Sequence, residues 1–325
     1  MTTLDVTDRL LKSEEPSIRY KVRLGVKRED PESRGMKRLR TEIRKSPRVQ
    51  ALLSERDADG RIPWHPYTKW RGTHWVLSIL ADLGYPPEDK SLEPLVDQAR
   101  CWALSLEPID INGRPRRCAS QEGNALLYLI RLGFVDGRCD VLANKLMACQ
   151  WPDGGWNCDK TPEACHASFH ESLIPFRALT AYAQVSGSRK AQTAANKAAE
   201  MFLDRSLFRR KTNGNIIRTQ FARTHYPYFW QYTYLHALKA MVEAGRIGDP
   251  RCIPALDLLE STRLPDGGFP AQCKHYTVIL SPRERRRTGQ TLVDWGPTGN
   301  TKRTGMNEWV TAEALTALNA AGRLG

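Results

Sequence analysis

The 325-residue chain lacks the long apolar runs, the export signal and the paired cysteine motifs that mark several common protein classes. No segment approaches the roughly 18 consecutive apolar residues of a membrane-spanning helix, and the first residues show no basic segment followed by an apolar one. Neither a Cys-x-x-Cys pair nor a repeated cysteine finger occurs among the eight cysteines, so we interpret them as reduced thiols or metal ligands. We therefore expect a soluble, cytoplasmic protein, with peripheral contact as the one membrane association left open.

Basic residues are in excess, with 49 Lys and Arg against 36 Asp and Glu and a formal net charge of +13. Most of the excess falls in residues 1–50, 201–225 and 273–303. A partner that bears phosphate would suit such clusters, and solvated surface charge is the alternative interpretation. We do not expect a nucleic-acid partner, because no recognised nucleic-acid-binding motif accompanies the charge.

A short turn signature, in which Asp or Asn precedes Gly, recurs along the chain. Its five copies are Asp59-Gly60, Asn112-Gly113, Asp153-Gly154, Asn213-Gly214 and Asp266-Gly267, spaced 41 to 60 residues apart. Such a pair favours a tight turn, because Gly accepts a positive φ and the Asx side chain bonds its own backbone. Each interval has room for two helices of ordinary length, so the chain is predicted to repeat an α-hairpin.

Two kinds of helix are predicted between these turns. Inner, largely apolar helices are expected over residues 74–80, 124–132, 168–184, 228–244 and 307–321. More amphipathic outer helices are expected over residues 95–103, 141–149, 192–203 and 253–259. Four inner helices are followed by a glycine stop, at Gly84, Gly133, Gly245 and Gly322. Such hairpins would form either a linear solenoid or a closed ring, and residues 1–55 could supply a further hairpin.

The third turn carries the most specific motif of the chain. Residues 146–156 follow the pattern Leu-x3-Gln-x3-Gly-x-Trp, with Gln150 and Trp156 at its key positions. This string resembles the QW repeat of the squalene-hopene and oxidosqualene cyclases and, more loosely, the protein prenyltransferase β subunits. The fifth turn keeps the frame with Arg263 for Gln and Phe269 for Trp. We expect the Gln side chain to bond backbone groups at a helix end, and the Trp to pack on the neighbouring hairpin.

The resemblance spans roughly residues 50–325 and implies an all-α, single-domain (α/α) toroid. Such a toroid would contain five to six α-hairpins around a central cavity, with QW-like repeats over residues 56–325 and a further hairpin from residues 1–55. The resemblance also implies a prenyltransferase-like or terpene cyclase-like enzyme that acts on an isoprenoid or other apolar substrate. The Asp-x-Asp-Asp motif of class II cyclases and the Asp-Asp-x-x-Asp motif of class I terpene synthases are absent, so acid/base catalysis would need other residues.

In such a ring, the residues that begin the inner helices would face the mouth of the cavity. From these positions we predict His170 and Glu171 as an acid/base pair and Glu122 as a second carboxylate. The predicted cavity wall consists of His74, Trp75, Tyr228, Trp230, Gln231, Asn307 and Glu308.

Each of these roles has a structural alternative. Ser168 and Glu171 match a capping box, in which Glu171 would only cap its own helix. An acid in a first helical turn, such as Glu122, interacts favourably with the helix dipole without any catalysis. The aromatic run 228–232 has the spacing of a packed helical core.

A zinc site is a further interpretation. In the protein prenyltransferase β subunits, zinc is held by an Asp-x-Cys at one inner-helix start and a His at a later one. Here Glu163 with Cys165, and later His225, are similar in position, and His166 is a substitute ligand. Carboxylate, thiolate and imidazole ligands with one open position describe a catalytic zinc site. The sequence itself requires no cofactor, so zinc belongs to this alternative.

Basic residues near the turns are candidates for contact with a diphosphate or an anionic surface. We single out Lys69, Arg71 and Arg210, together with a basic loop at Arg283–Arg287. The expected partner is an apolar or isoprenoid small molecule that can bear a diphosphate. Two functions stand beside the acid/base enzyme: a non-catalytic toroid that binds an apolar ligand or a protein, and a zinc-dependent transferase.

Overall fold

The computed structural model of the chain describes residues 3–279, 288–299 and 305–324. Within these residues the protein is mostly helical, with thirteen α-helices, 52% helix and a few short strands. The α-helices are α1 (Thr3–Leu11), α2 (Pro16–Gly25), α3 (Arg34–Lys45), α4 (Pro47–Leu53), α5 (Thr73–Leu83), α6 (Glu93–Ser105), α7 (Ala119–Arg131), α8 (Gly137–Ala148), α9 (Phe169–Ser186), α10 (Arg189–Leu203), α11 (Tyr234–Glu243), α12 (Ile253–Ser261) and α13 (Glu308–Ala320). The strands are β1 (Ile109–Ile111), β2 (Arg114–Arg116), β3 (Thr277–Val278) and β4 (Gln290–Thr291). Among the described helices, none combines the length and the apolar content needed to cross a bilayer.

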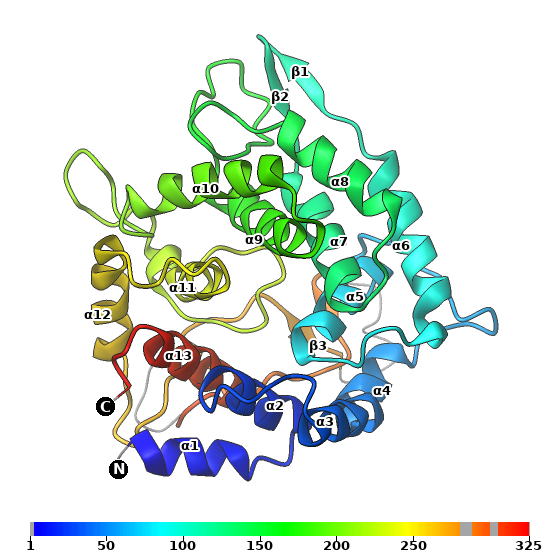
Figure 1. The fold of residues 1–325 in the computed structure, drawn as a ribbon, viewed down its shortest axis with the longest axis vertical. Coiled ribbons are helices and arrows are strands. Elements are labelled where there is room, and N and C mark those ends of the chain that lie inside the picture. The colour runs from blue at the N-terminus through cyan, green and yellow to red at the C-terminus, as the bar shows by residue number, and fades with distance from the viewer. Residues whose placement is uncertain (1–2, 280–287, 300–304, 325) are drawn as a thin grey trace.

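Six helices, α2, α5, α7, α9, α11 and α13, contact one another in a closed order (Figure 1). Each packs against the next of the six along the chain, and α13 returns to pack against α2. The other long helices flank this set: α3 packs on α2, α6 on α5 and α7, α8 on α7, α10 on α9, and α12 on α11. We call the six the inner helices. The predicted alternation of inner and outer helices is therefore present.

Burial of the inner helices follows from their composition. Residues 171–180 of α9 are all buried, and the apolar residues among them are spread around the whole helix rather than along one stripe. The outer helix α10 instead buries one stripe of small residues, Ala191, Ala194, Ala195, Ala198 and Ala199. Such a stripe lets α10 approach α9 closely while its opposite face stays in solvent.

The glycine positions behave as predicted. All five Asx-Gly turns and all four glycine stops place their glycine at positive φ. The stop after α5 shows why the residue is needed: Gly84 has a φ of 81°, and a Cβ built there would lie 2.5 Å from the ring of Tyr20. A larger residue would therefore be strained and would also collide with α2.

The third turn forms a staple, but its two parts differ from the expectation: Gln150 reaches the middle of the next helix, α10, and Trp156 bonds the helix before the turn, α8. The side-chain amide of Gln150 donates hydrogen bonds of 2.8 Å to the backbone oxygens of Gly154, within the turn, and Ala194, in α10. The ring of Trp156 is fully buried, and its Nε1 donates to the backbone oxygen of Leu146 near the end of α8, also at 2.8 Å. One turn thus ties α8 to α10.

Three predicted segments differ from the structure. Asn112-Gly113 joins the antiparallel strands β1 and β2 rather than two helices, because a two-residue Asn-Gly loop favours a β-hairpin. Residues 228–233 are not helical: α11 begins at Tyr234, where Thr233 caps the helix by accepting a hydrogen bond from the backbone N–H of His236. Residues 1–55 supply the four helices α1 to α4 rather than a single hairpin.

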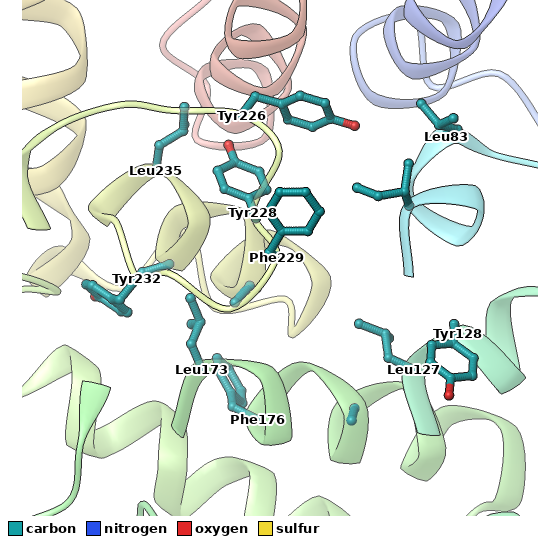
Figure 2. Close-up of a cluster of buried hydrophobic side chains, with 14 of the residues drawn as sticks. Leu83, Leu127, Tyr128, Leu173, Phe176, Tyr226, Tyr228, Phe229, Tyr232 and Leu235 are labelled. Atoms are coloured by element: carbon teal, nitrogen blue, oxygen red, sulfur yellow. The ribbon is translucent and has the colours of Figure 1, made fainter. Parts of the chain in front are cut away.

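Side chains fill the space between the inner helices. Tyr226, Tyr228 and Phe229, from the segment before α11, lie in this space (Figure 2). The ring of Trp70 stacks on that of Phe229, with centroids 3.9 Å apart. A cavity of about 40 Å³ remains beside Tyr228, whereas a cavity of about 570 Å³ opens between α2, α5, α11 and α13.

Four charged side chains join the inner helices at the larger cavity. Lys21 of α2 and Lys239 of α11 each lie 2.7–2.9 Å from both Asp82 of α5 and Glu313 of α13. Burial alone would raise the pKa of the two carboxyls, but the attraction of the ammonium groups outweighs burial and lowers the pKa of both. This group, which we call the ion square, links the first inner helix to the last.

Candidate functional site

Two histidines and a cysteine meet between the segment before α11 and the loop after α12. His225 belongs to the first segment, and Cys273 and His275 belong to the second. Their sulfur and ring nitrogens lie within 4.8 Å of one another. Cys273 Sγ is 4.0 Å from His275 Nε2, and the two imidazole centroids are 4.6 Å apart. We call these three residues the His/Cys trio.

Backbone hydrogen bonds position the trio. The carbonyl of Thr224 accepts a bond of 3.2 Å from the N–H of Cys273, which places Cys273 beside His225. The indole of Trp70 donates a bond of 2.8 Å to the backbone oxygen of His275. These bonds therefore fix both Cys273 and His275 to other segments of the fold.

The surroundings of His225 fit those of a metal ligand. Its side chain is 1% exposed, and neither ring nitrogen has a hydrogen-bond partner among the described residues. Burial lowers the pKa of His225 well below the usual value, so the ring is neutral, as a ligand must be. Tetrahedral zinc would separate a sulfur and a nitrogen ligand by about 3.5 Å, so the 4.0 Å between Cys273 and His275 needs only a small inward movement.

His170 and Trp230 lie beside the trio. His170 Nδ1 accepts a bond of 3.0 Å from the backbone N–H of Tyr232, so the neutral ring carries its proton on Nε2. The ring of Trp230 meets that of His170 edge-on, at 5.2 Å between centroids. Burial and, to a smaller extent, the charges of Arg218 and His275 lower the pKa of His170 to about 4. His170 is therefore a neutral hydrogen-bond donor near pH 7.

Glu171, the next residue along α9, faces different neighbours from His170. Its carboxylate accepts a bond of 3.0 Å from a backbone N–H in the first turn of α7, and Cys158 Sγ lies 3.6 Å from it. Cys118 completes a group whose donor atoms lie within 4.8 Å of one another. The capping-box alternative is wrong, because Ser168 makes no capping bond with its side chain and Glu171 reaches α7 instead. An acid/base role for His170 and Glu171 stays a prediction.

Glu122 is fully buried in α7, where its carboxylate forms an ion pair with Arg117. The guanidinium of Arg117 also donates a bond of 2.8 Å to the backbone oxygen of Leu106. This pairing explains why an acid occupies a position without solvent. The geometry favours a structural role for Glu122.

His74 and Trp75, predicted for the cavity wall, belong to the packed interior. Both are at most 1% exposed, and the rings of Trp75, Trp102 and Tyr128 lie edge-on to His74 with centroids 4.7–5.7 Å away. Neither nitrogen of His74 has a hydrogen-bond partner among the described residues. Burial lowers the pKa of His74 to about 3, which keeps the imidazole neutral.

The remaining predicted wall residues have separate surroundings. Tyr228 lines the small inner cavity, and Gln231 is buried beside Trp230. Asn307 caps α13 with its side-chain oxygen, and Glu308 accepts a bond of 2.7 Å from the hydroxyl of Ser13. The structure therefore does not bring the predicted wall residues together around one cavity.

The predicted metal ligands Glu163, Cys165 and His166 are exposed on the loop before α9. Within the described residues, the fourth predicted ligand, His225, groups with Cys273 and His275 instead. Arginines of β2 hold this loop, because Arg114 and Arg116 donate to the backbone oxygen of residue 164. The structure therefore does not bring the predicted ligand set together, and the His/Cys trio is the candidate group that contains His225.

The predicted anion-binding residues are also dispersed. Lys69 is half-buried, and its ammonium lies 5.2 Å from the ring centroid of Trp230. Arg71 is buried in an ion pair with Glu55, with one nitrogen-to-oxygen distance of 2.8 Å. Arg210 is exposed on a separate loop. The basic loop Arg283–Arg287 lies outside the described residues.

Sequence reasoning missed Cys273, His275 and Cys158, because it considered mainly the starts of the inner helices. All three occupy loops. A signal for the first two exists in the Cys-Lys-His string that follows the fifth Asx-Gly turn. Cys158 offers no comparable local signal.

No protein-family model matches the chain, and no curated protein matches its sequence. The assignment of function therefore depends on the residues and their geometry.

Proposed function

We propose that the protein is a zinc-dependent enzyme that has the (α/α) toroid fold of the terpenoid cyclase and prenyltransferase superfamily and transfers or hydrolyses a group on an isoprenoid-like substrate. The observation that carries the proposal is the His/Cys trio, in which His225 is buried without a hydrogen-bond partner among the described residues. The closed order of contacts among the inner helices and the Gln150–Trp156 staple support the fold.

The donor set suits zinc, because two imidazoles and one thiolate leave a fourth position open. Zinc bound there would supply a Lewis acid that lowers the pKa of a water or thiol at the open position. His170 presents its Nε2–H as a hydrogen-bond donor beside the trio. Trp230 offers an apolar face, and Lys69 offers a cation close to that face. An apolar chain with an anionic head group would suit this combination.

Metal content is the direct test. Protein purified without chelator or metal-affinity tag is expected to hold about one zinc per chain. Inductively coupled plasma mass spectrometry measures this content. Cys273→Ser and His275→Asn should each lose the metal while the helical circular dichroism is kept. After cobalt exchange, the wild type should show a sulfur-to-metal charge-transfer band that Cys273→Ser lacks.

A matched control is Cys165→Ser, which removes an exposed thiol that the sequence alone favoured as a ligand. This variant should keep both the metal and the cobalt band. Loss of metal in Cys165→Ser with retention in Cys273→Ser would overturn the assignment, and so would a wild type that binds no zinc after incubation with it.

The substrate class is tested with an isoprenoid diphosphate, such as farnesyl diphosphate, in a calorimetric titration of the zinc-loaded protein. Lys69→Ala should weaken binding about tenfold, because it removes the cation beside Trp230. Arg210→Ala, on a separate exposed loop, should leave binding unchanged. Equal losses in both variants would indicate a general effect of charge and would contradict this substrate site.

A second candidate function is ligand binding without catalysis, favoured by the cavity of about 570 Å³. Its volume is that of a typical small-molecule pocket, and its wall combines apolar side chains of α13 with the ion square. Organic extraction of the purified protein, followed by mass spectrometry, should then recover a stoichiometric small molecule. Ala320→Trp, which narrows the cavity, should reduce the recovered amount, while the metal content should not change.

A further inference from the structure

Cys118 and Cys158 form a pair of thiols outside the His/Cys trio. Cys118 is the residue that precedes α7, and Cys158 lies in the loop before α9. Both are free and half-buried, so a small reagent can reach them. Their sulfur atoms lie within 4.8 Å of each other.

The backbone brings the two cysteines together. The N–H of Arg117 donates a bond of 2.9 Å to the carbonyl of Asn157, one residue before each cysteine. This bond holds the two segments side by side where the cysteines follow, and the sulfur atoms already lie within 4.8 Å of each other. The two sulfur atoms therefore have a short distance to close before they can join.

A carboxylate faces this pair. Glu171 Oε1 lies 3.6 Å from Cys158 Sγ, and the side chain of Glu171 is 8% exposed. Its other oxygen is held by the backbone N–H of Ser120 at 3.0 Å. A carboxylate held beside a thiol is placed to accept its proton.

We propose that Cys118 and Cys158 form a reversible disulfide, with Cys118 as the attacking thiol and Glu171 as the base that activates Cys158. The oxidant is a low-molecular-weight disulfide such as oxidised glutathione. This redox site lies beyond the proposed metal function and does not depend on it.

The exchange proceeds in two balanced steps. The thiolate of Cys118, its proton lost to water, attacks one sulfur of the oxidant, forms a mixed disulfide and releases one small-molecule thiolate. Glu171 then takes the proton of Cys158, whose sulfur attacks Cys118 Sγ, forms the protein disulfide and releases the second thiolate. The two protein thiols are oxidised by two electrons, the oxidant is reduced to two thiols, and Glu171 returns its proton to the departing thiolate.

The order of attack follows from the surroundings of the two sulfurs. The neighbouring thiol of Cys158 is the largest cause that lowers the pKa of Cys118. Burial and the charge of Glu171 oppose this effect, and the charges of Lys160 and Arg117 add to it, so the pKa of Cys118 is lowered. The position of Cys118 at the start of α7 also favours a thiolate. The hydrogen-bonding interaction with Cys118, burial and the charge of Glu171 all raise the pKa of Cys158. Cys158 therefore needs a base to become a thiolate.

The test exposes the full-length protein to millimolar oxidised glutathione, blocks the remaining thiols and maps the products by peptide mass spectrometry. The expected product is a Cys118–Cys158 disulfide that dithiothreitol reverses. Cys158→Ser should stop the reaction at one glutathione adduct on Cys118. Cys165→Ser, which alters an exposed thiol of the same loop, should still form the disulfide.

Glu171→Gln distinguishes a role as a base from a purely structural role. Gln can still accept the hydrogen bond from the first turn of α7, but it cannot take a proton from Cys158. The mixed disulfide on Cys118 should accumulate, and the rate of closure should fall about tenfold and lose its dependence on the ionisation of a carboxyl. Unchanged kinetics in Glu171→Gln would overturn the role of Glu171. Thiols that stay free, pair with other cysteines or are protected by a metal would overturn the redox site.

Discussion

Lys21 Nζ of α2 lies 2.8 Å from Glu313 Oε1 of α13, although 292 residues separate the two in the chain. The pair belongs to the ion square, in which each ammonium contacts both carboxylates. All four side chains are at most 16% exposed. A buried charge without a partner is strongly destabilising, so removal of any member of the ion square should lower the stability of the fold.

Lys21→Met is expected to destabilise the protein by about 3–5 kcal/mol, because two buried carboxylates would then share one ammonium. Urea denaturation at pH 7 measures the loss. The matched control is Lys37→Met, since Lys37 pairs with Glu32 at a position where both side chains are mostly exposed. That change should stay within about 0.5 kcal/mol. Equal losses in both variants would contradict the role of the square.

His74 is expected to make stability depend on pH between about 3 and 6.5. Its pKa is lowered to about 3 by burial, whereas the unfolded chain has a His pKa near the usual value of about 6.5. In this window the unfolded state binds a proton that the folded state does not, so stability falls as the pH falls. The loss from this residue between pH 7 and pH 5 should be roughly 1–2 kcal/mol.

His74→Phe checks this prediction, because Phe keeps an aromatic ring among Trp75, Trp102 and Tyr128 without a titrating group. Stability at pH 7 should stay within about 1 kcal/mol of the wild type. Urea titrations at pH 5 and pH 7 should show a smaller difference than the wild type by the amount assigned to His74. An unchanged difference between pH 5 and pH 7 would mean that folded His74 takes up a proton as readily as it does in the unfolded chain, and would contradict the prediction.

Trp156→Phe is expected to cost about 2–4 kcal/mol, because it leaves a cavity and removes the donor to the backbone oxygen of Leu146. Thermal or urea unfolding measures the change. Trp64→Phe is the control, since Trp64 is 39% exposed and Phe keeps a ring for the guanidinium of Arg71. A control as damaging as Trp156→Phe would argue against the staple.

Glu122→Gln is expected to cost about 3–5 kcal/mol, because the buried guanidinium of Arg117 would lose its counter-charge. The double variant Glu122→Leu with Arg117→Met should recover part of this loss, since no charge is then left unpaired. Unfolding measurements on Glu122→Leu, on Arg117→Met and on the double variant give the coupling energy. Additive losses would show that the two side chains do not stabilise each other.

The sequence predicts the helices well because their signals are local. Apolar stripes, Asx-Gly turns and glycine stops each act within a few residues. In the weaker fifth turn, the two motif positions contact each other, with Arg263 over the ring of Phe269 at 5.1 Å. Within the candidate site, the sequence singles out His225, but it does not predict the residues that lie beside it. Cys273 reaches it through a backbone bond to Thr224, and His275 is held by Trp70. Such long-range contacts leave no periodic pattern in the sequence.

The closed order of the inner helices also bears on how the chain folds during synthesis. The contact between α2 and α13 joins segments at opposite ends of the described chain, so it cannot form until the ribosome has released α13. Until then, Lys21 has Asp82 but lacks Glu313, and the face of α2 that packs against α13 has no cover. A nascent chain held at this stage is expected to be a target for chaperones, and the last helix completes the fold.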